Sequence, residues 1–405
     1  MLKAATAVTY ELDSIEKGIS ELSDKILKEL DMKRSGIAIM LCDSDAEHEK
    51  LASGLHRRLG VPVVGFSSTA MFCRSEGLCD SVGILTAVSS DDVDFSVAVS
   101  EPLTPGNVTE QIELTYKRAL DSLPGEPKLV MAFPPYILGI MLDVYPRELG
   151  RVSGGLPVFG GLPAHDETHG RTIIYCGDTA YGDRMAVVLV SGAVKPVMTV
   201  KNSLGALANL KRTVTSSKNN VVYKVGDDTF VRFLEQFGLD VEKLANPEER
   251  TTSFTTYPLL VEGTGTEETD GIPVVRTIHG VDLETGSGTA IGEIPEGATL
   301  SVGVLHPDDI KNSTLSSAED IVKQMKENER DGYRYSMVFG VSCVARYYVM
   351  ASRNTLEADV LKSGLPEDLA LFGYYSFGEI CPTSAPASGP ARNAAHNESL
   401  VLLAL

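Results

Sequence analysis

Apolar positions in the first part of the chain alternate between helical and strand spacing. Apolar residues from Ile15 to Leu30 recur every three or four positions, which predicts an amphipathic helix. The uninterrupted apolar run 36–42 predicts a strand buried on both faces. The next stretch predicts a helix that ends at Leu59, because Gly60 follows, and 61–66 predicts another strand. This alternation of helices and strands indicates parallel strand pairing at the start of a sheet.

The pattern then changes to strands that follow one another directly. Residues 81–89 and 93–99 both have strand patterns, and the acidic turn Asp91–Asp92 between them predicts an antiparallel pair. Further helices are predicted at 109–123 and 136–149, and further strands at 128–133, 157–159, 171–176 and 184–191. Strand pairs mixed with helix-linked strands indicate a mixed sheet with helices on its faces.

The most polar interruption, residues 212–220, is the predicted domain boundary. A chain of 405 residues is too long for one ordinary core, so we expect two domains, 1–212 and 213–405. In the second half, helices are predicted at 227–238 and 316–328, and strands at 254–261, 274–280, 289–294 and 298–305. The predicted fold class is therefore a mixed α/β protein of two lobes, each a mixed sheet flanked by helices.

Composition and charge exclude several classes of protein. No run of about 18 apolar residues is present, so we expect no membrane insertion. The N-terminus lacks the sustained apolar core of a signal peptide, which indicates a cytoplasmic protein. A formal charge of −19 argues against nucleic acid or an anionic membrane as a partner.

The sequence predicts neither a cofactor nor a metal. Glycine-rich phosphate loops are absent, so no nucleotide cofactor is expected. The six cysteines form no Cys-x-x-Cys pair, and we expect reduced and mostly buried thiols. His165 and His169 have metal-like spacing, but Pro163 and Gly170 flank them. A loop is therefore expected there instead of the helix that such a metal site needs.

Polar groups with different chemistry lie between short apolar strands in residues 335–405. Residues 336–341 and 400–405 predict strands, and 342–346 predicts the start of a helix. Between them lies 372–380, in which glycine and aromatic residues alternate around Glu379. Such an arrangement is typical of a small-ligand pocket.

Cys343 and Arg346 lie three residues apart at this helix start and therefore share one face. Free backbone N–H groups favour an anion there, and the guanidinium of Arg346 matches a carboxylate, so this corner is predicted to hold a ligand carboxylate. The alternative is a structural salt bridge from Arg346 to Glu357 or Glu379.

Strand alternation places Tyr375, Phe377 and Glu379 on one face, with Tyr374 and Ser376 beside them. A carboxylate among aromatic rings suits an ammonium group. Glu379 and Arg346 would then bracket the two charges of an amino acid. A structural strand with a buried ion pair is the alternative.

The remaining candidates lie at strand ends. His396 and Asn397 are predicted either to line a pocket rim or to cap a strand. Ser67, Ser68 and Thr69 follow a strand and could offer hydroxyls to a ligand, without the Gly-x-Ser-x-Gly pattern of a serine nucleophile. His165 and Asp166 could face a ligand in the first lobe.

The order of these motifs resembles the FIST family of sensory domains. The order is Ser-Cys-x-x-Arg at 342–346, Gly-Tyr-Tyr-Ser-Phe-Gly-Glu-Ile at 373–380, and His-Asn-x-Ser at 396–399. Upstream, 62–69 and 158–166 are also similar, so the resemblance covers roughly 35–405. Where many members have a Thr-Ala-Gly-Glu type turn, this chain has Thr-Ala-Met-Phe at 69–72.

The resemblance implies a sensor of small ligands, such as amino acids or similar small carboxylates, that acts in signal transduction. A separate signalling protein is a possible partner. Two alternatives remain open. One is a thiol-dependent enzyme, in which a helix N-terminus lowers the pKa of Cys343 and His396 comes close in the fold. The other is a scaffold protein without a ligand.

Overall fold

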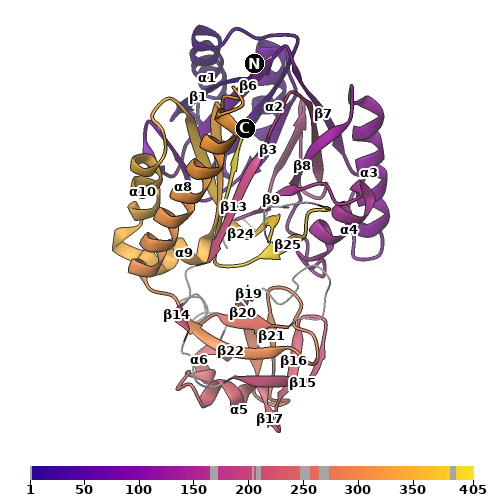
Figure 1. The fold of residues 1–405 in the computed structure, drawn as a ribbon, viewed down its shortest axis with the longest axis vertical. Coiled ribbons are helices and arrows are strands. Elements are labelled where there is room, and N and C mark those ends of the chain that lie inside the picture. The colour runs from indigo at the N-terminus through magenta and orange to yellow at the C-terminus, as the bar shows by residue number, and fades with distance from the viewer. Residues whose placement is uncertain are drawn as a thin grey trace.

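The computed structural model describes residues 2–164, 172–202, 205–206, 211–246, 256–263, 273–383 and 389–405. These residues form a large α/β body and a smaller β domain (Figure 1). The chain leaves the body after β13 (Val197–Asn202) and returns to it with α8 (Pro307–Glu329). The β domain, formed by the described residues between 205 and 305, is therefore an insertion into the body.

The first sheet of the body comes from the N-terminal half. Its strand order is β1-β6-β2-β3-β10-β11. The bounds are β1 (Lys3–Thr9), β2 (Ser35–Cys42), β3 (Val63–Ser67), β6 (Gly83–Ser90), β10 (Ile174–Gly177) and β11 (Thr179–Tyr181). Its outer face is covered by α1 (Ile15–Glu29) and α2 (His48–Leu59), whose apolar stripes pack into one buried cluster with the strands.

The second sheet joins strands from both ends of the chain in the order β13-β26-β23-β24-β9-β8-β12-β7. Their bounds are β7 (Val93–Val99), β8 (Pro127–Phe133), β9 (Val158–Pro163), β12 (Ala186–Gly192), β23 (Met337–Cys343), β24 (Ala370–Pro382) and β26 (Ser399–Ala404). Three short strands extend it, β4 (Met71–Cys73), β5 (Gly77–Cys79) and β25 (Asn393–His396).

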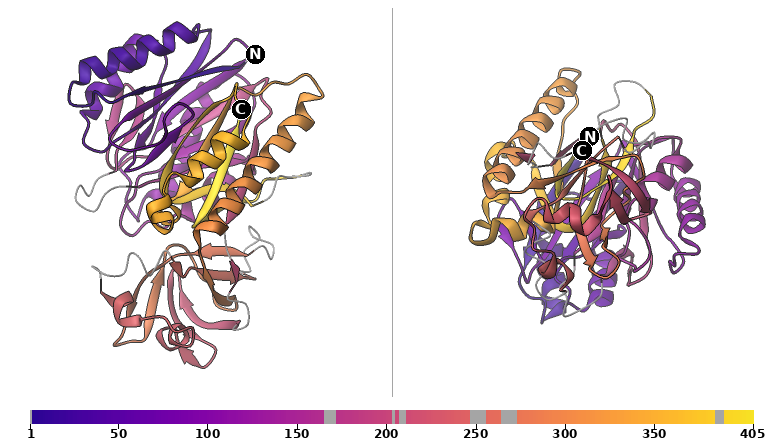
Figure 2. Two further views of the ribbon diagram at one scale, coloured as in Figure 1. Left: turned by 90° about the vertical axis from the view of Figure 1, so that its left-hand side faces the viewer. Right: turned by 90° about the horizontal axis from the view of Figure 1, so that it is seen from below.

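The two sheets pack face to face, with helices outside. A buried cluster between them contains Phe66 from the first sheet and Phe133 and Phe339 from the second. The outer face of the second sheet is covered by two groups of helices. These are α3 (Val108–Ser122) with α4 (Val144–Ser153), and α8 with α9 (Val344–Met350) and α10 (Leu356–Gly364). Figure 2 shows these layers from the side.

The second sheet contains the same topology twice. In each half, two parallel strands, β8 with β9 or β23 with β24, lie beside two antiparallel strands, β12 with β7 or β26 with β13. Helices α3 and α4 connect the first set of strands, and α8, α9 and α10 connect the second. The halves meet where β9 and β24 pair antiparallel. The structure therefore has an internal repeat that no short sequence repeat indicates.

The inserted β domain has its own core, built from buried residues between Val214 and Val302. Its strand order is β19-β18-β22-β15-β16-β21-β20, with the short β14 and β17 at its margin. The bounds are β14 (Gly205–Ala206), β15 (Arg212–Lys218), β16 (Val221–Val225), β17 (Asp228–Thr229), β18 (Leu259–Glu262), β19 (Val274–Arg276), β20 (Ile278–Asp282), β21 (Ser287–Ala290) and β22 (Thr299–Val304). Two short helices, α5 (Phe230–Glu235) and α6 (Val241–Ala245), complete it.

Mixed sheets flanked by helices confirm the predicted fold class, but one local prediction of strand pairing is wrong. Strands β6 and β7 are not a hairpin, because β6 pairs with β1 and β2 and β7 pairs with β12 in the other sheet. The turn at Asp91–Asp92 instead carries the chain from one sheet to the next. The polar stretch 212–220 forms β15 and the turn into β16.

The division of the chain into domains 1–212 and 213–405 remains a prediction. Of the helices in the described ranges, none combines the length and the apolar character that crossing a bilayer requires.

Candidate functional site

The candidate site lies where β24 meets β9, β25 and the start of β26. Glu379 in β24 is fully buried there. The pairing of β24 with β9 has a register shift between Ser376 and Gly378. This irregularity lets the Ser376 hydroxyl donate a hydrogen bond to Oε1 of Glu379 at 2.6 Å. The Ser399 N–H donates to Oε2 at 3.2 Å.

The same register shift corrects the prediction that Tyr375 and Glu379 share one strand face. Glu379 acts electrostatically on Tyr374, whereas Tyr375 lies beside Glu357 and Arg346. The two tyrosine rings are buried on opposite sides of β24. Tyr374 packs in the cluster between the sheets and Tyr375 packs under the helices. Strict alternation fails because a bulge inserts an extra residue into the ladder.

Glu398 is a second buried acid at this position, and the sequence analysis overlooked it. It lies between β25 and β26 with φ of +53°, a left-handed conformation, and its side chain is fully buried. Thr277 of the β domain donates to its Oε1 at 3.0 Å. Within the described part of the chain, Glu398 Oε2 and the neighbouring Asn397 Oδ1 have no hydrogen-bond partner. The only sequence signal was an acid inside the His-Asn-x-Ser motif.

Burial governs the protonation of these groups. It raises the pKa of Glu379 to about 8, although hydrogen bonds from Ser376 and Ser399 partly offset it. Burial also raises the pKa of Glu398 well above its usual range, and the negative charge of Glu379 adds to this. Near neutral pH, proton binding is therefore the way the two carboxyl groups avoid an uncompensated buried charge.

The thiol of Cys343 does not have the lowered pKa that the sequence predicted for it. Burial raises the pKa of its thiol well above the ordinary value, and the carboxylates of Glu379 and Glu398 raise it further. The expectation that the helix N-terminus activates a thiolate is therefore wrong, since burial and two acids outweigh the first turn of the short helix α9. His396 does not supply a base, because its Nε2 lies 2.9 Å from the Cys381 carbonyl oxygen and burial lowers its pKa to about 4.

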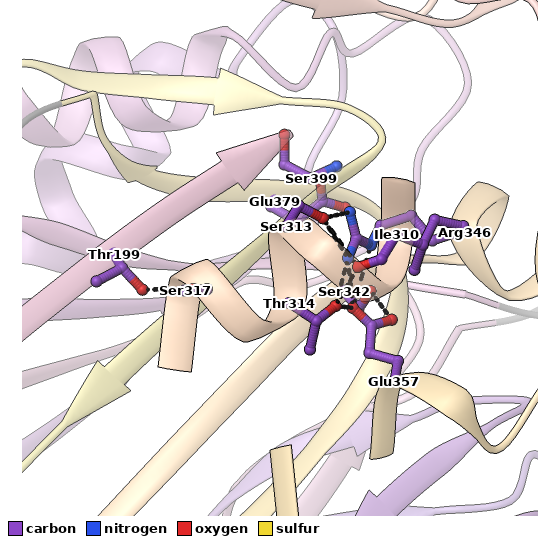
Figure 3. A network of polar contacts seen from close by, with 10 residues as sticks. All are labelled: Thr199, Ile310, Ser313, Thr314, Ser317, Ser342, Arg346, Glu357, Glu379 and Ser399. Atoms are coloured by element: carbon purple, nitrogen blue, oxygen red, sulfur yellow. Dashed lines mark hydrogen bonds and ion pairs between the residues drawn. The ribbon is translucent and has the colours of Figure 1, made fainter. Parts of the chain in front are cut away.

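Arg346 forms a fully buried ion pair with Glu357 of α10 (Figure 3). Its Nη2 lies 2.7 Å from Glu357 Oε1 and also donates to Thr314 of α8 at 3.0 Å. The Ser342 hydroxyl donates to the other oxygen of Glu357 at 2.8 Å. One of the two salt bridges considered from the sequence is thus formed. Burial raises the pKa of nearby Glu379, and the positive charge of Arg346 offsets part of that rise.

The first-half candidates have structural contacts. Ser67 and Ser68 are fully buried. The Ser67 hydroxyl accepts from the Ile173 N–H at 2.9 Å, and the Ser68 hydroxyl donates to the Tyr375 carbonyl at 2.9 Å. Ser68 thereby connects β3 to β24, while Thr69 next to it is half-buried. His165 and Asp166 lie outside the described residues.

Neither Glu379 nor Glu398 lines any of three hollows in the protein surface. Three hollows of about 500, 600 and 460 Å³ lie respectively beside Tyr10, beside His48, and between α8 and the end of α10. In the described ranges, no three His, Cys, Asp or Glu side chains are placed to hold a metal ion. Among the described side chains, the site offers carboxyl and amide oxygens as acceptors but no set of three metal ligands.

Comparisons with known proteins agree with the motif order. A model of the FIST N domain matches residues 36–228, and a model of the FIST C domain matches residues 233–382. A comparison with curated proteins gave no match. Among solved structures, a cyanuric acid hydrolase is similar over 100% of this chain and 99% of its own, with a TM-score of 0.36 and 8% identity. A cyanuric acid hydrolase from A. caulinodans covers the same shares, with a TM-score of 0.34 and 8% identity.

Proposed function

Because this chain belongs to the FIST family, with a FIST N domain followed by a FIST C domain, we propose that it is a sensory protein for small amines, with free amino acids as the preferred class. FIST domains are sensory domains in signal transduction. The observation that carries the proposal is the pair of buried acids, Glu379 and Glu398, beside the unpartnered Oδ1 of Asn397.

An ammonium group fits the chemistry of these acceptors. It carries three N–H donors and one positive charge. Oε2 of Glu398 and Oδ1 of Asn397 would each accept one hydrogen bond, and Glu379 would supply the nearby negative charge. Unpaired buried acceptors cost free energy, so a ligand that satisfies them gains affinity from the same groups.

Binding of a cation would be coupled to proton release. Burial raises the pKa of Glu379 to about 8, so this carboxyl group is largely protonated in the free protein at pH 7. A bound ammonium favours the ionised form and would displace the proton. Affinity should therefore rise as the pH increases from 6 to 8.

The contacts of Arg346 give it a supporting role in this proposal. Its guanidinium group donates hydrogen bonds to Glu357 and Thr314, and its positive charge favours the ionised form of Glu379. The amine end of the ligand is therefore better supported by the contacts than the carboxylate end that the sequence suggested for Arg346.

Entry of a ligand would involve the inserted β domain. Thr277, which follows β19, donates to Glu398, so the β domain covers one side of the acidic pair. An amine bound at the other oxygen, Oε2, would change the charge of the carboxyl group to which Thr277 donates. Ligand binding could then be read by a separate signalling protein as a change in how the β domain is held. A cytoplasmic location is part of the proposal, supported by six free thiols.

Calorimetric titration of the full chain with amino acids, simple primary amines and the corresponding carboxylic acids without the amine tests the proposal. We expect heat and proton release with amines only, and at least a tenfold loss of affinity in Glu379→Gln and Glu398→Gln. Glu327→Gln, an exposed acid of α8, is the matched control.

A thermal-shift measurement gives an independent check. A ligand at a hundred times its dissociation constant stabilises the folded state by about 2.7 kcal/mol. Binding that is unchanged in both site variants, or that requires the carboxylate and not the amine, would overturn the assignment.

A further inference from the structure

Two cysteines on the β4–β5 hairpin lie on the same face of the second sheet. The ladder pairs Cys73 with Gly77 and Met71 with Cys79, so the two cysteines are diagonal neighbours across the strand pair. The Cys79 thiol donates to the carbonyl of Gly77, the residue that pairs with Cys73, at 3.8 Å. Both residues are buried, but the turn between them is exposed at Ser75 and Glu76.

Polar groups of the turn lie beside the Cys73 sulfur. The Ser75 hydroxyl lies 3.4 Å from it, and either group can be the donor. The interaction with Cys79 lowers the pKa of the Cys73 thiol, and Ser75 and the backbone of Ser75 and Glu76 lower it further, whereas the interaction with Cys73 raises the pKa of the Cys79 thiol. A turn that directs several N–H groups at one atom stabilises negative charge there. The pair thus has one sulfur suited to attack and a second suited to follow.

Burial determines the pKa of the thiol at two of the other cysteines. Cys176 has the same exposed fraction as Cys79, 8%, but burial raises its pKa to about 12. Burial also raises the pKa of Cys42 to about 12. Cys73 therefore differs from these two cysteines because burial does not dominate the pKa of its thiol.

We propose that Cys73 and Cys79 form a peroxide-reactive dithiol that closes to a disulfide. The Cys73 thiolate attacks one oxygen of hydrogen peroxide, the O–O bond breaks, and hydroxide leaves with a proton taken from solvent as water. The resulting sulfenic acid is then attacked by the Cys79 sulfur, which forms the S–S bond and releases a second water. The two thiols lose two electrons and two hydrogens in total, and the peroxide is reduced.

Oxidation at this hairpin would act on the strand that carries Glu379. β4 pairs with β24 from Phe372 to Tyr374, and the Arg74 N–H donates to the Leu371 carbonyl at 2.9 Å. Diagonal Cβ atoms in a strand pair are farther apart than a disulfide tolerates, so closure shifts β4 relative to β5. Oxidation of the two thiols does not require an amine to be bound, so it can be tested without a ligand.

The test is intact mass spectrometry and peptide mapping of the reduced full chain before and after hydrogen peroxide. We expect a mass lower by two hydrogens and a peptide that links Cys73 to Cys79. In Cys79→Ser, dimedone should instead trap a sulfenic acid at Cys73. Cys176→Ser is the matched control and should behave as the unaltered chain does.

The unaltered chain alone can decide the question if a variant fails to fold. Differential alkylation after peroxide should find Cys73 and Cys79 protected and Cys176 free. Peroxide oxidation that falls first on Cys176 or Cys42, or no linked peptide at any peroxide dose that leaves the protein folded, would overturn the proposal.

Discussion

At the scale of single residues, the buried Arg346–Glu357 pair connects three helices and a strand. Both side chains are 0% exposed, and partners come from Ser342 on β23 and Thr314 on α8. Two charges in such a place depend on each other, because either one alone would be an uncompensated charge in a medium of low dielectric constant. The pair holds α9 and α10 against the sheet beside Glu379.

Removal of one partner should therefore destabilise the protein strongly. We expect Arg346→Ala and Glu357→Gln each to lower the free energy of unfolding by about 3–5 kcal/mol, measured by urea denaturation. The double variant Arg346→Met with Glu357→Leu should recover most of this loss. A double variant whose loss equals the sum of the two single losses would mean that the pair is not coupled.

Glu379 should make stability depend on pH in a defined window. Its pKa is raised to about 8 in the folded state, so the folded protein binds a proton that the unfolded chain releases near pH 4.5. Its contribution to stability is complete below about pH 4.5 and is lost as the pH rises through about 8. In Glu379→Gln, unfolding free energy should fall less between pH 5 and 8 than in the unaltered chain. Equal slopes for the two proteins would contradict the raised pKa.

For single residues, the sequence predicted which side chains pair better than it predicted their burial and backbone conformation. Both possible salt bridges of Arg346 were considered, and the one to Glu357 formed. Glu398 escaped notice because its role depends on a left-handed backbone and on Thr277, which is more than a hundred residues away. Cys343 was misjudged because a helix start is visible in the sequence, whereas burial beside two acids is not.

At the scale of secondary-structure elements, β3 depends on a glycine in the close approach of parallel strands. Gly65 has φ of +124°, and a Cβ at this position would lie 2.1 Å from the carbonyl oxygen of Met40 on β2. A side chain would therefore both strain the backbone and clash with the neighbouring strand. This strand is followed by Ser68, whose hydroxyl binds the Tyr375 carbonyl on β24.

Gly65→Ala should cost roughly 3–5 kcal/mol, because an unfavourable φ and an overpacked contact add. Gly60→Ala is the matched control: it also has positive φ, +70°, but nothing lies within 4 Å of its Cβ position. That change should cost only about 1 kcal/mol. Thermal unfolding of the two variants measures the difference, and similar losses would argue against the clash.

The positions of helices and strands along the chain were more predictable than which strands pair with each other. Helix α1 and strands β2, β7 and β8 lie close to their predicted positions, because local apolar spacing determines them. Pairing was less predictable, as the β6–β7 turn shows, because a turn of two acidic residues serves a hairpin and a passage between sheets equally well. The edge strand β1 was not predicted, and α4 begins at Val144 although 136–149 was expected to be helical.

At the scale of the whole molecule, the β domain contacts the body through polar residues. Arg276 Nη2 lies 2.7 Å from Asp143 Oδ1, and Nη1 donates to the Ala395 carbonyl at 3.1 Å. The Glu293 N–H donates to the other oxygen of Asp143 at 3.2 Å. The core of the β domain is separate from the cores of the body. The domain is therefore expected to unfold as a unit of its own.

Calorimetry of Arg276→Ala tests this arrangement. Asp143 would be left buried without its cation, so we expect docking to weaken by roughly 3 kcal/mol and a separate, lower transition to appear for the β domain. Lys211→Ala is a suitable control, since it removes only an exposed ion pair to Glu262 within the domain. That change should shift stability by no more than about 0.5 kcal/mol. One shared transition in both variants would contradict independent unfolding.

The central pairing of β9 with β24 gives one polypeptide the character of two tethered protomers. Separated, each half would expose an edge strand able to recruit another chain, which makes the covalent link a protection against mispairing. In a true homodimer, a residue on the dyad appears twice. Here Glu379 and Glu398 come only from the later half, and Gly161 lies opposite Glu379. Because the two halves belong to one chain, the β9–β24 junction need not be symmetric. The later half supplies the acids there, and the earlier half supplies a glycine backbone.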